Sequence, residues 1–334
     1  MLTKNQFALL SYIAVRPADE PMLSQRAIAQ GTGKALGTVN GLVKQLDAMG
    51  YLDGANRITD AGRAALAPYR VDNAVIMAAG MSSRFAPLSY EKPKALLKVK
   101  GEVLIEREIR QLQAAGIDDI TIVVGYMKEK LFYLEDRFHV KIVINEDYYR
   151  YNNPSTLMLV RDRLKNTFIC SSDNYFEQNP FEPYVYQAYY ASLYSAGKTD
   201  EYCMATNRKG RITGVQVGGS DAWYMIGHAY FDRSFSEKFT QILEREYDSP
   251  VTRAGLWEDL YARHIRELEM YIRKYPGGIH EFDSLDELRA FDSAYVTNTD
   301  TYIFDNICAV LHCTPDSIHG IIPIKTGLTN LSFK

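Results

Sequence analysis

The stretch from residue 78 to residue 97, AAGMSSRFAPLSYEKPKALL, decides the fold and the site. It begins in the short apolar run 74–79, which is typical of a buried parallel strand that leads into a loop. Gly80 can take a positive φ, and small residues let the backbone approach a phosphate. Main-chain N–H groups near Ser82 and Ser83 can form an anion-binding nest. The stretch therefore predicts a phosphate-binding loop, with an ordinary strand-turn-helix junction as the alternative.

Two cations lie in the same stretch. Arg84 offers a planar fork of donors, which we assign to a triphosphate. Lys94, after Pro93, is a compact point charge, which we place near an acceptor phosphate or the α-phosphate. A strand, a loop of small residues and two cations indicate a nucleoside triphosphate site. Arg84 and Lys94 are therefore predicted to be catalytic in a nucleotidyltransferase.

Strands and helices alternate from 71 to about 292, which predicts an α/β fold with a mostly parallel sheet flanked by helices. The site is expected at the carboxyl ends of the strands. The expected strands are 74–79, 120–124, 140–144 and 167–170, and the expected helices are 104–115 and 128–138.

The motif AAGMSSRFAPLSYEKPKALLKVKGEVLIE resembles the N-terminal signature of the sugar-phosphate and alcohol-phosphate nucleotidyltransferases. Among these, the bacterial CTP:phosphocholine cytidylyltransferases are the most similar. The likeness continues in segments 114–134, 144–160, 171–176, 257–261 and 279–288 and covers about 71–292. It implies a Rossmann-like sheet of the nucleotidyltransferase type. The choice of choline rests on the later motifs alone, because a fold does not settle function.

The resemblance also implies a metal site. Mg²⁺ takes one or two carboxylates and otherwise binds water and phosphate oxygens. Asp173 follows the apolar strand 167–170 and stands in SSDNY, where the family has its metal-binding aspartate. Glu281 and Asp283 match a late acidic motif of the family, with Glu281 preferred as the second ligand and the order between the two left open. Ser171 stands where the family often has another acid.

Nucleotide and choline contacts follow from the same likeness. The predicted nucleotide-binding residues are Ala78, Ala79, Gly80, Met81, Ser82, Ser83 and Arg84, with Asn152, Asn153 and Thr156 from a later loop. Amide side chains can read a cytosine edge. A quaternary ammonium needs aromatic faces and a nearby carboxylate, for which Trp257, Glu258 and Tyr175 are the candidates. With 24 tyrosines in the chain, an aromatic residue near the site can also arise by chance.

Residues 1–70 have a different pattern, with three helical segments, a short ribbon and a closing helix. This pattern resembles a winged helix-turn-helix domain, whose recognition helix would present Lys34, Thr38, Asn40 and Lys44 to DNA. The segment has three more basic than acidic residues, which is compatible with DNA binding without requiring it. The alternative is a module for dimerisation or docking, which would make the chain a homodimer.

The tail 293–334 contains IIPIKTGLTN, which resembles the first strand and nucleotide loop of a choline-kinase-like phosphotransferase. The expectation is a chain cut from a longer polypeptide whose missing part makes phosphocholine. A terminal strand that pairs locally is the alternative.

Composition describes an ordinary globular chain, with 46% hydrophobic and 24% charged residues. The net charge of −3 does not favour a protein dominated by nucleic-acid binding. No apolar run is long enough to span a membrane and the N-terminus lacks a signal-peptide pattern, so a cytoplasmic protein without membrane contact is expected. The four cysteines are expected to be reduced and mostly packed, because their spacing is a poor zinc signature.

The expected activity is Mg²⁺-dependent transfer of CMP from CTP to phosphocholine. One alternative is a nucleotidyltransferase for phosphoethanolamine, an aminoalkylphosphonate or a sugar 1-phosphate. Another is a DNA-binding regulator whose transferase domain senses nucleotide.

Overall fold

The computed structural model describes residues 1–16, 23–82, 85, 88–282, 284–293 and 302–320, with the backbone of 323–324 and 332–333. The chain divides into two compact units. The first is Met1–Val71 with Glu182–Gln187, and the second is Asp72–Phe181 with Ala188–Lys334. Sequence analysis assigned 182–187 to the second unit and treated 293–334 as a separate segment.

The first unit is helical. Its elements are α1 (Lys4–Ala14), α2 (Gln25–Thr32), α3 (Leu36–Ala48), α4 (Asp60–Leu66) and the 3₁₀ turn η1 (Ala67–Tyr69). A capping box of Thr3 and Gln6 starts α1, and Gly33, at φ +63°, ends α2. Leu52 and Ile58 form an antiparallel bridge where the wing was expected. The side chains of Thr38, Asn40 and Lys44 on α3 are exposed, but binding of DNA and dimerisation stay predictions.

The segment Glu182–Gln187 is part of the core of this first unit. The ring of Tyr186 stacks on Tyr69 with centroids 5.5 Å apart, and its hydroxyl donates to the carbonyl of Leu2 at 3.2 Å. Phe7 packs against both rings. Two stretches of chain that are more than a hundred residues apart therefore build one apolar core.

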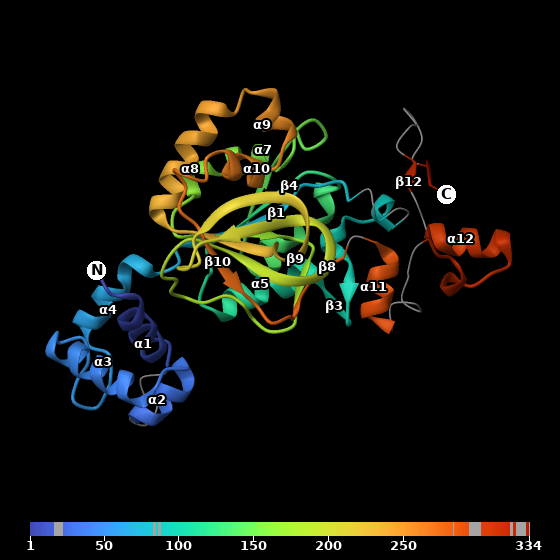
Figure 1. Cartoon of the computed structure of the whole chain (residues 1–334). Coiled ribbons are helices and arrows are strands. Elements are labelled where there is room, and N and C mark those ends of the chain that lie inside the picture. Colours follow the sequence, from blue (N-terminus) through green and yellow to red (C-terminus); the bar gives the residue numbers. More distant parts are fainter. Residues whose placement is uncertain are drawn as a thin grey trace. The chain divides into compact units, whose positions relative to one another are not determined.

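The second unit is built on a seven-stranded sheet in the order β10-β8-β9-β6-β1-β4-β5 (Figure 1). Its strands are β1 (Asn73–Ala78), β4 (Ile120–Val124), β5 (Lys141–Ile144), β6 (Thr167–Ser171), β8 (Tyr189–Thr206), β9 (Ile212–Phe231) and β10 (Tyr271–Lys274). β1 pairs in parallel with β4 and β6, and β5 extends the parallel part beyond β4. The predicted Rossmann-like, mostly parallel sheet is confirmed.

The exception to parallel pairing is the long, curved β8–β9 ribbon, drawn in yellow in Figure 1. β9 runs antiparallel to both β8 and β6, and the β8–β9 register shifts at several bulges. Three two-stranded sheets complete the unit, made from β2 (Lys98–Val99) and β3 (Glu102–Val103), β7 (Asn174–Phe176) and β11 (Ile279–Glu281), and β12 (Pro323–Ile324) and β13 (Ser332–Phe333).

The helices of the second unit are α5 (Leu104–Ala114), α6 (Tyr133–Phe138), α7 (Asn153–Leu159), α8 (Arg233–Glu246), α9 (Pro250–Ala254), α10 (Trp257–Arg263), α11 (Leu285–Phe291) and α12 (Tyr302–Leu311). Short 3₁₀ turns are η3 (Leu88–Tyr90), η4 (Lys94–Leu96), η5 (Lys128–Lys130), η6 (Arg161–Arg163) and η8 (Pro315–Ser317). The expected helix 128–138 is therefore divided between η5 and α6. Among the described residues, no helix is both long enough and apolar enough to cross a bilayer. Residues 321–322 and 325–330 of the kinase-like segment lie outside the description.

Candidate active site

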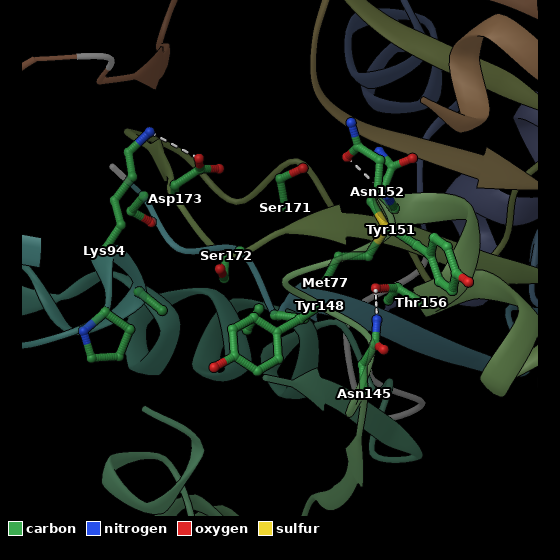
Figure 2. Close-up of a pocket in the computed structure, with 17 residues that line it drawn as sticks. Met77, Lys94, Asn145, Tyr148, Tyr151, Asn152, Thr156, Ser171, Ser172 and Asp173 are labelled. Atoms are coloured by element: carbon green, nitrogen blue, oxygen red, sulfur yellow. Dashed lines mark hydrogen bonds and ion pairs between the residues drawn. The ribbon is translucent and has the colours of Figure 1, made fainter. Parts of the chain in front are cut away.

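A cavity of about 210 Å³ opens where β1, β5 and β6 end (Figure 2). It lies at the carboxyl edge of the parallel strands, where the strand pattern placed the site. Its lining residues are Met77, Ala78, Ala79, Gly80, Ser82, Pro93, Lys94, Ala95, Asn145, Tyr148, Tyr151, Asn152, Asn153, Thr156, Ser171, Ser172 and Asp173. Segments from the phosphate loop, the Pro93 turn, the loop after β5 and the loop after β6 therefore meet in one place.

An ion pair lies at the edge of the cavity. Nζ of Lys94 lies 2.9 Å from Oδ2 of Asp173, although the two residues are 79 positions apart in the chain (Figure 2). Lys94 is only 6% exposed, so this ion pair stabilises its buried ammonium group. The pair juxtaposes a cation and a carboxylate at the edge of a space large enough for phosphate groups.

The second carboxylate oxygen of Asp173 is suited to a metal ion. Oδ1 is buried and accepts no hydrogen bond from any described residue, which leaves a hard oxygen ligand without a partner. Glu281 lies on β11 and pairs with Asn174 of β7, so it stands across the ladder from the residue that follows Asp173. In the described part of the chain no three metal-ligating side chains gather. Mg²⁺ needs only one or two: Asp173 fits this, whereas Glu281 does not line the cavity. Asp283 lies outside the described residues.

The phosphate loop departs from the expected backbone in one respect. Ser82, at φ +51°, takes the left-handed conformation, whereas Gly80 does not. A Cβ added to Gly80 would meet no described atom within 4 Å, so the absence of a side chain there leaves room for a ligand. Met81 is 47% exposed and does not line the cavity. Ser83 and Arg84, which complete the predicted loop, lie outside the described residues.

The amides expected to read a base line the cavity but already have partners. Asn152 caps α7 by accepting from the N–H of Asn153 at 2.9 Å. Oδ1 of Asn153 accepts from the N–H of Trp257 at 2.7 Å, and its Nδ2 lies 3.5 Å from Oε2 of Glu258. The hydroxyl of Thr156 accepts from Nδ2 of Asn145 at 3.2 Å. A base edge would have to share or displace these hydrogen bonds.

Sequence analysis missed Asn145, Tyr148, Tyr151 and Ser172 among the lining residues. Asn145 was detectable in principle, because it is the polar residue directly after the strand 141–144. The two tyrosines gave no separate signal in a chain with 24 of them.

The choline-binding prediction named Trp257, Glu258 and Tyr175, and none of the three lines any of the three cavities described for this structure. Trp257 is fully buried and stacks on Tyr190 with ring centroids 5.5 Å apart. Glu258 accepts from the hydroxyl of Tyr190 at 2.9 Å, and burial raises its pKa to about 7. Tyr175 packs in a separate core cluster. In this structure Trp257 and Tyr175 pack in apolar clusters, and their contact with choline stays a prediction.

A second cavity, of about 430 Å³, opens on the β8–β9 ribbon. Its lining residues are Tyr194, Ser195, Thr199, Glu201, Tyr224, Ile226, Glu281 and Glu287. Three carboxylates and two tyrosines thus line one space, and burial raises the pKa of Tyr224. Glu281, which lines this cavity, is the strand partner of Asn174, the residue directly after Asp173. Such a lining suits a small organic cation.

Glu108 is a buried carboxyl on α5, 1% exposed, and faces the thiol of Cys170 on β6. Its pKa is raised well above the usual range, first by burial and then by the charge of Asp173. A carboxyl that stays protonated in the folded state favours folding at low pH. This contribution is lost as pH rises from the unfolded-state pKa towards the higher folded-state pKa.

We therefore expect Glu108→Gln to change the pH dependence of stability. Relative to wild type, the variant should gain free energy of unfolding as pH rises, by up to about 1.4 kcal/mol per pH unit, because its amide does not ionise. Urea unfolding at several pH values, without metal ion, measures the difference. Glu129→Gln, at an exposed position, is the control. A Glu108→Gln difference that stays constant with pH would contradict the assignment.

Gly125, directly after β4, allows the main chain to lie close to Tyr148 and Ala79, which line the first cavity. A Cβ there would lie 2.7 Å from Cβ and Cγ of Tyr148 and 2.8 Å from the carbonyl oxygen of Ala79. We expect Gly125→Ala to destabilise the protein by roughly 1–3 kcal/mol and to weaken nucleotide binding, since both neighbours line the cavity. Thermal unfolding with and without nucleotide measures both effects. Gly54→Ala, whose Cβ would meet no described atom within 4 Å, should change neither; equal melting temperatures for the two variants would argue against steric control.

Comparison with known proteins agrees with the geometry. Residues 74–246 match the model of the MobA-like NTP transferase domain. The chain is 34% identical to the 2-aminoethylphosphonate cytidylyltransferase of Lancefieldella rimae, over 67% of this chain and 93% of that protein. It is 31% identical to the choline-phosphate cytidylyltransferase of Streptococcus pneumoniae, over 66% of this chain and 96% of that protein.

The fold comparison leads to the same group. The structure of the CTP:phosphocholine cytidylyltransferase from Streptococcus pneumoniae superposes with a TM-score of 0.65, covering 68% of this chain and 99% of that one. The family model matches more than half of the chain, and two relatives above 30% identity are covered almost completely. The prediction of a nucleotidyltransferase is thus confirmed, and the chain belongs to the cytidylyltransferases that carry a MobA-like NTP transferase domain.

Proposed function

We propose that the protein transfers CMP from CTP to phosphocholine, giving CDP-choline and pyrophosphate. The observation that carries the proposal is that the second unit has two cavities with unlike linings. The first has the phosphate loop and the Lys94–Asp173 pair, and the second has three glutamates and two tyrosines. A triphosphate suits the first cavity, and the cationic head of a phosphorylated acceptor suits the second.

In this reaction a phosphate oxygen of the acceptor attacks the α-phosphorus of CTP. The new P–O bond forms as the bond to pyrophosphate breaks, and pyrophosphate leaves with the electron pair. The protein has to align the two phosphates and to neutralise their charge. Lys94 is proposed to donate to a phosphate oxygen, and Arg84 is proposed to bind the triphosphate. Asp173 and Glu281 would hold Mg²⁺, which supplies charge neutralisation at the phosphates when bound.

The acceptor is the finer part of the proposal. Tyrosine faces suit a trimethylammonium group, which cannot donate hydrogen bonds. A primary ammonium, as in 2-aminoethylphosphonate or phosphoethanolamine, donates three hydrogen bonds, which carboxylates accept. Glu201 and Glu287 of the second cavity, which are not assigned to the metal ion, therefore make 2-aminoethylphosphonate a second candidate, and the relative from Lancefieldella rimae supports it. A sugar 1-phosphate has no cation for these carboxylates. The regulator hypothesis, with DNA bound by residues 1–70, remains a separate proposal.

Pyrophosphate release by the purified chain with Mg²⁺ tests the proposal. CTP is compared with UTP and ATP, and phosphocholine with phosphoethanolamine, 2-aminoethylphosphonate and glucose 1-phosphate. Release selective for CTP and phosphocholine supports it. Selective release with phosphoethanolamine or 2-aminoethylphosphonate would change the proposed acceptor and leave the proposed CMP transfer unchanged. Absence of release with every acceptor contradicts enzymatic function and favours the regulator.

A further inference from the structure

The strand that follows Asp173 is held by a guanidinium from α5, and we propose that Arg107 is a positioning residue for the metal-binding carboxylates. The inference rests on the proposed function, in which Asp173 and Glu281 hold the metal ion. Arg107 lines neither the first nor the second cavity, so its role would lie in holding the metal-binding residues in position.

Arg107 makes its contacts with main-chain carbonyls. Its Nε and Nη2 donate to the carbonyl oxygen of Phe176 at 3.1 and 2.9 Å, and Nη2 also donates to that of Glu177 at 3.2 Å. One turn further along α5, Nε2 of Gln111 donates to the carbonyl of Phe176 at 3.1 Å. Two side chains of one helix therefore hold the end of β7.

β7 matters because it relates the two carboxylates to each other. The strand starts at Asn174, directly after Asp173, and its ladder partner β11 places Glu281 opposite Asn174. Among the described residues, β7 has three residues and forms a ladder with β11 alone. The side-chain hydrogen bonds from α5 add to the contacts that hold this small sheet, which include the hydrogen bond from Nδ2 of Asn174 to the carbonyl of Gly227 on β9 at 3.3 Å.

The guanidinium is itself fixed on its other sides. Nη1 pairs with a carboxylate oxygen of Glu102, and the Cζ atom of the guanidinium lies 4.6 Å from the centroid of the Tyr175 ring. The Arg107 side chain is 19% exposed. A planar group with several donors can hold two carbonyls and a carboxylate at once, whereas an ammonium cannot do so in the same plane.

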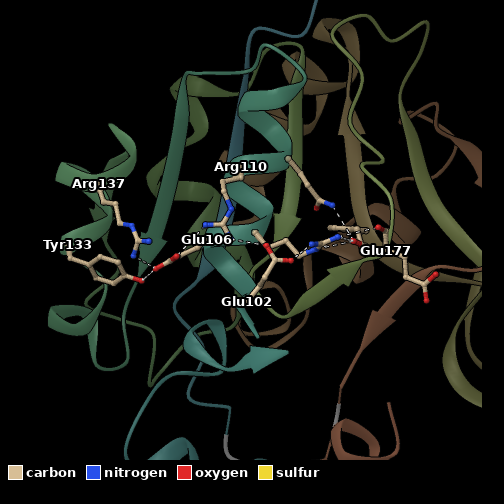
Figure 3. Close-up of polar contacts among 9 residues, drawn as sticks. Glu102, Glu106, Arg110, Tyr133, Arg137 and Glu177 are labelled. Carbon is tan, nitrogen blue, oxygen red and sulfur yellow. Dashed lines mark hydrogen bonds and ion pairs between the residues drawn. The ribbon is translucent and has the colours of Figure 1, made fainter. Parts of the chain in front are cut away.

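Arg110 provides a matched control on the same helix. It binds Glu102 at 3.2 Å and Glu106 at 3.4 Å, on the side of α5 that faces Tyr133 and Arg137 (Figure 3). It shares with Arg107 the helix, the charge and one acidic partner. The difference between the two is that Arg107 binds the end of β7.

The test compares Arg107→Lys and Arg107→Met with Arg110→Lys and Arg110→Met in the full chain. Electron paramagnetic resonance measures Mn²⁺ bound by each protein in the presence of CTP without acceptor. Circular dichroism and thermal unfolding report the fold, and steady-state kinetics separate kcat from the KM for CTP. Gln111→Leu, which removes only the second anchor, covers the case in which an Arg107 variant does not fold.

We expect Arg107→Lys to weaken Mn²⁺ binding and to lower kcat by about 10-fold, within the 10–100-fold range of residues that orient metal ligands. The KM for CTP should change by less than about twofold, because the phosphate loop is untouched. Gln111→Leu should shift Mn²⁺ binding in the same direction, and both Arg110 variants should bind Mn²⁺ as wild type does.

Folded Arg107 variants, or a folded Gln111→Leu, that bind Mn²⁺ like wild type would overturn the inference. Asp173→Asn separates this outcome from failure of the proposed function. If Asp173→Asn also binds Mn²⁺ normally, the metal role of Asp173 is wrong and the inference falls with it. If only Asp173→Asn loses Mn²⁺, the proposed function stands and the role of Arg107 is rejected.

Discussion

Asp173→Asn should abolish CMP transfer while the protein keeps its native fold. The amide keeps the shape of the side chain but loses the charge that would hold Mg²⁺ and that pairs with Lys94 at 2.9 Å. Loss of electrostatic stabilisation at phosphates of this kind costs at least about 10²–10³-fold in kcat, which corresponds to roughly 3–4 kcal/mol. Pyrophosphate release with saturating CTP and acceptor measures the effect.

The control for this substitution is Asp118→Asn, an exposed aspartate in the same unit. It should leave turnover unchanged. Circular dichroism should show native secondary structure for both variants, with a lower melting temperature for Asp173→Asn because Lys94 stays buried without its partner. Near-normal pyrophosphate release by folded Asp173→Asn would remove this residue from the mechanism.

Lys94→Met is the second substitution for which we expect a large effect. Methionine fills similar space but has no charge to offer a phosphate oxygen, so kcat should fall by about 10²–10³-fold. The fold should also be weaker, because Asp173 loses a buried partner. Pyrophosphate release and urea unfolding measure the two effects separately.

Lys98→Met, four residues away and exposed, should be close to wild type in both measurements. The double variant Asp173→Asn/Lys94→Met should be less impaired than the sum of the single effects, because the two side chains contact each other. Additive effects on kcat and stability would show that Lys94 and Asp173 act independently, contrary to the observed ion pair.

The sheet and the first cavity were predictable because their signals are local. Short apolar runs between polar residues marked β1, β4, β5 and β6, and a parallel sheet brings the residues after such strands to one edge. Lys94 and Asp173 could therefore be placed in one site from sequence alone. The pairing of their charged atoms, by contrast, needed the structure.

The second cavity could not be predicted, since it depends on long-range antiparallel pairing with bulges. The sequence 189–231 contains no motif that predicts the course of the β8–β9 ribbon. The direction of Trp257 was also unpredictable, because an aromatic residue in a helix can face the core or a ligand. Arg107 resembled an ordinary surface residue, and only the position of the Phe176 carbonyl explains its orientation.

The six residues Glu182–Gln187 have a consequence for dividing the protein. The polypeptide leaves the first unit after Val71, returns to it at Glu182 and leaves again after Gln187. A fragment that starts at residue 72 would keep Tyr186 but lose Tyr69, Phe7 and the Leu2 carbonyl that this side chain contacts. Removal of residues 1–71 would therefore leave part of the first unit's core on the remaining chain. An insertion or deletion near residue 185 would disturb the core of the first unit as directly as a mutation in the helices of that unit.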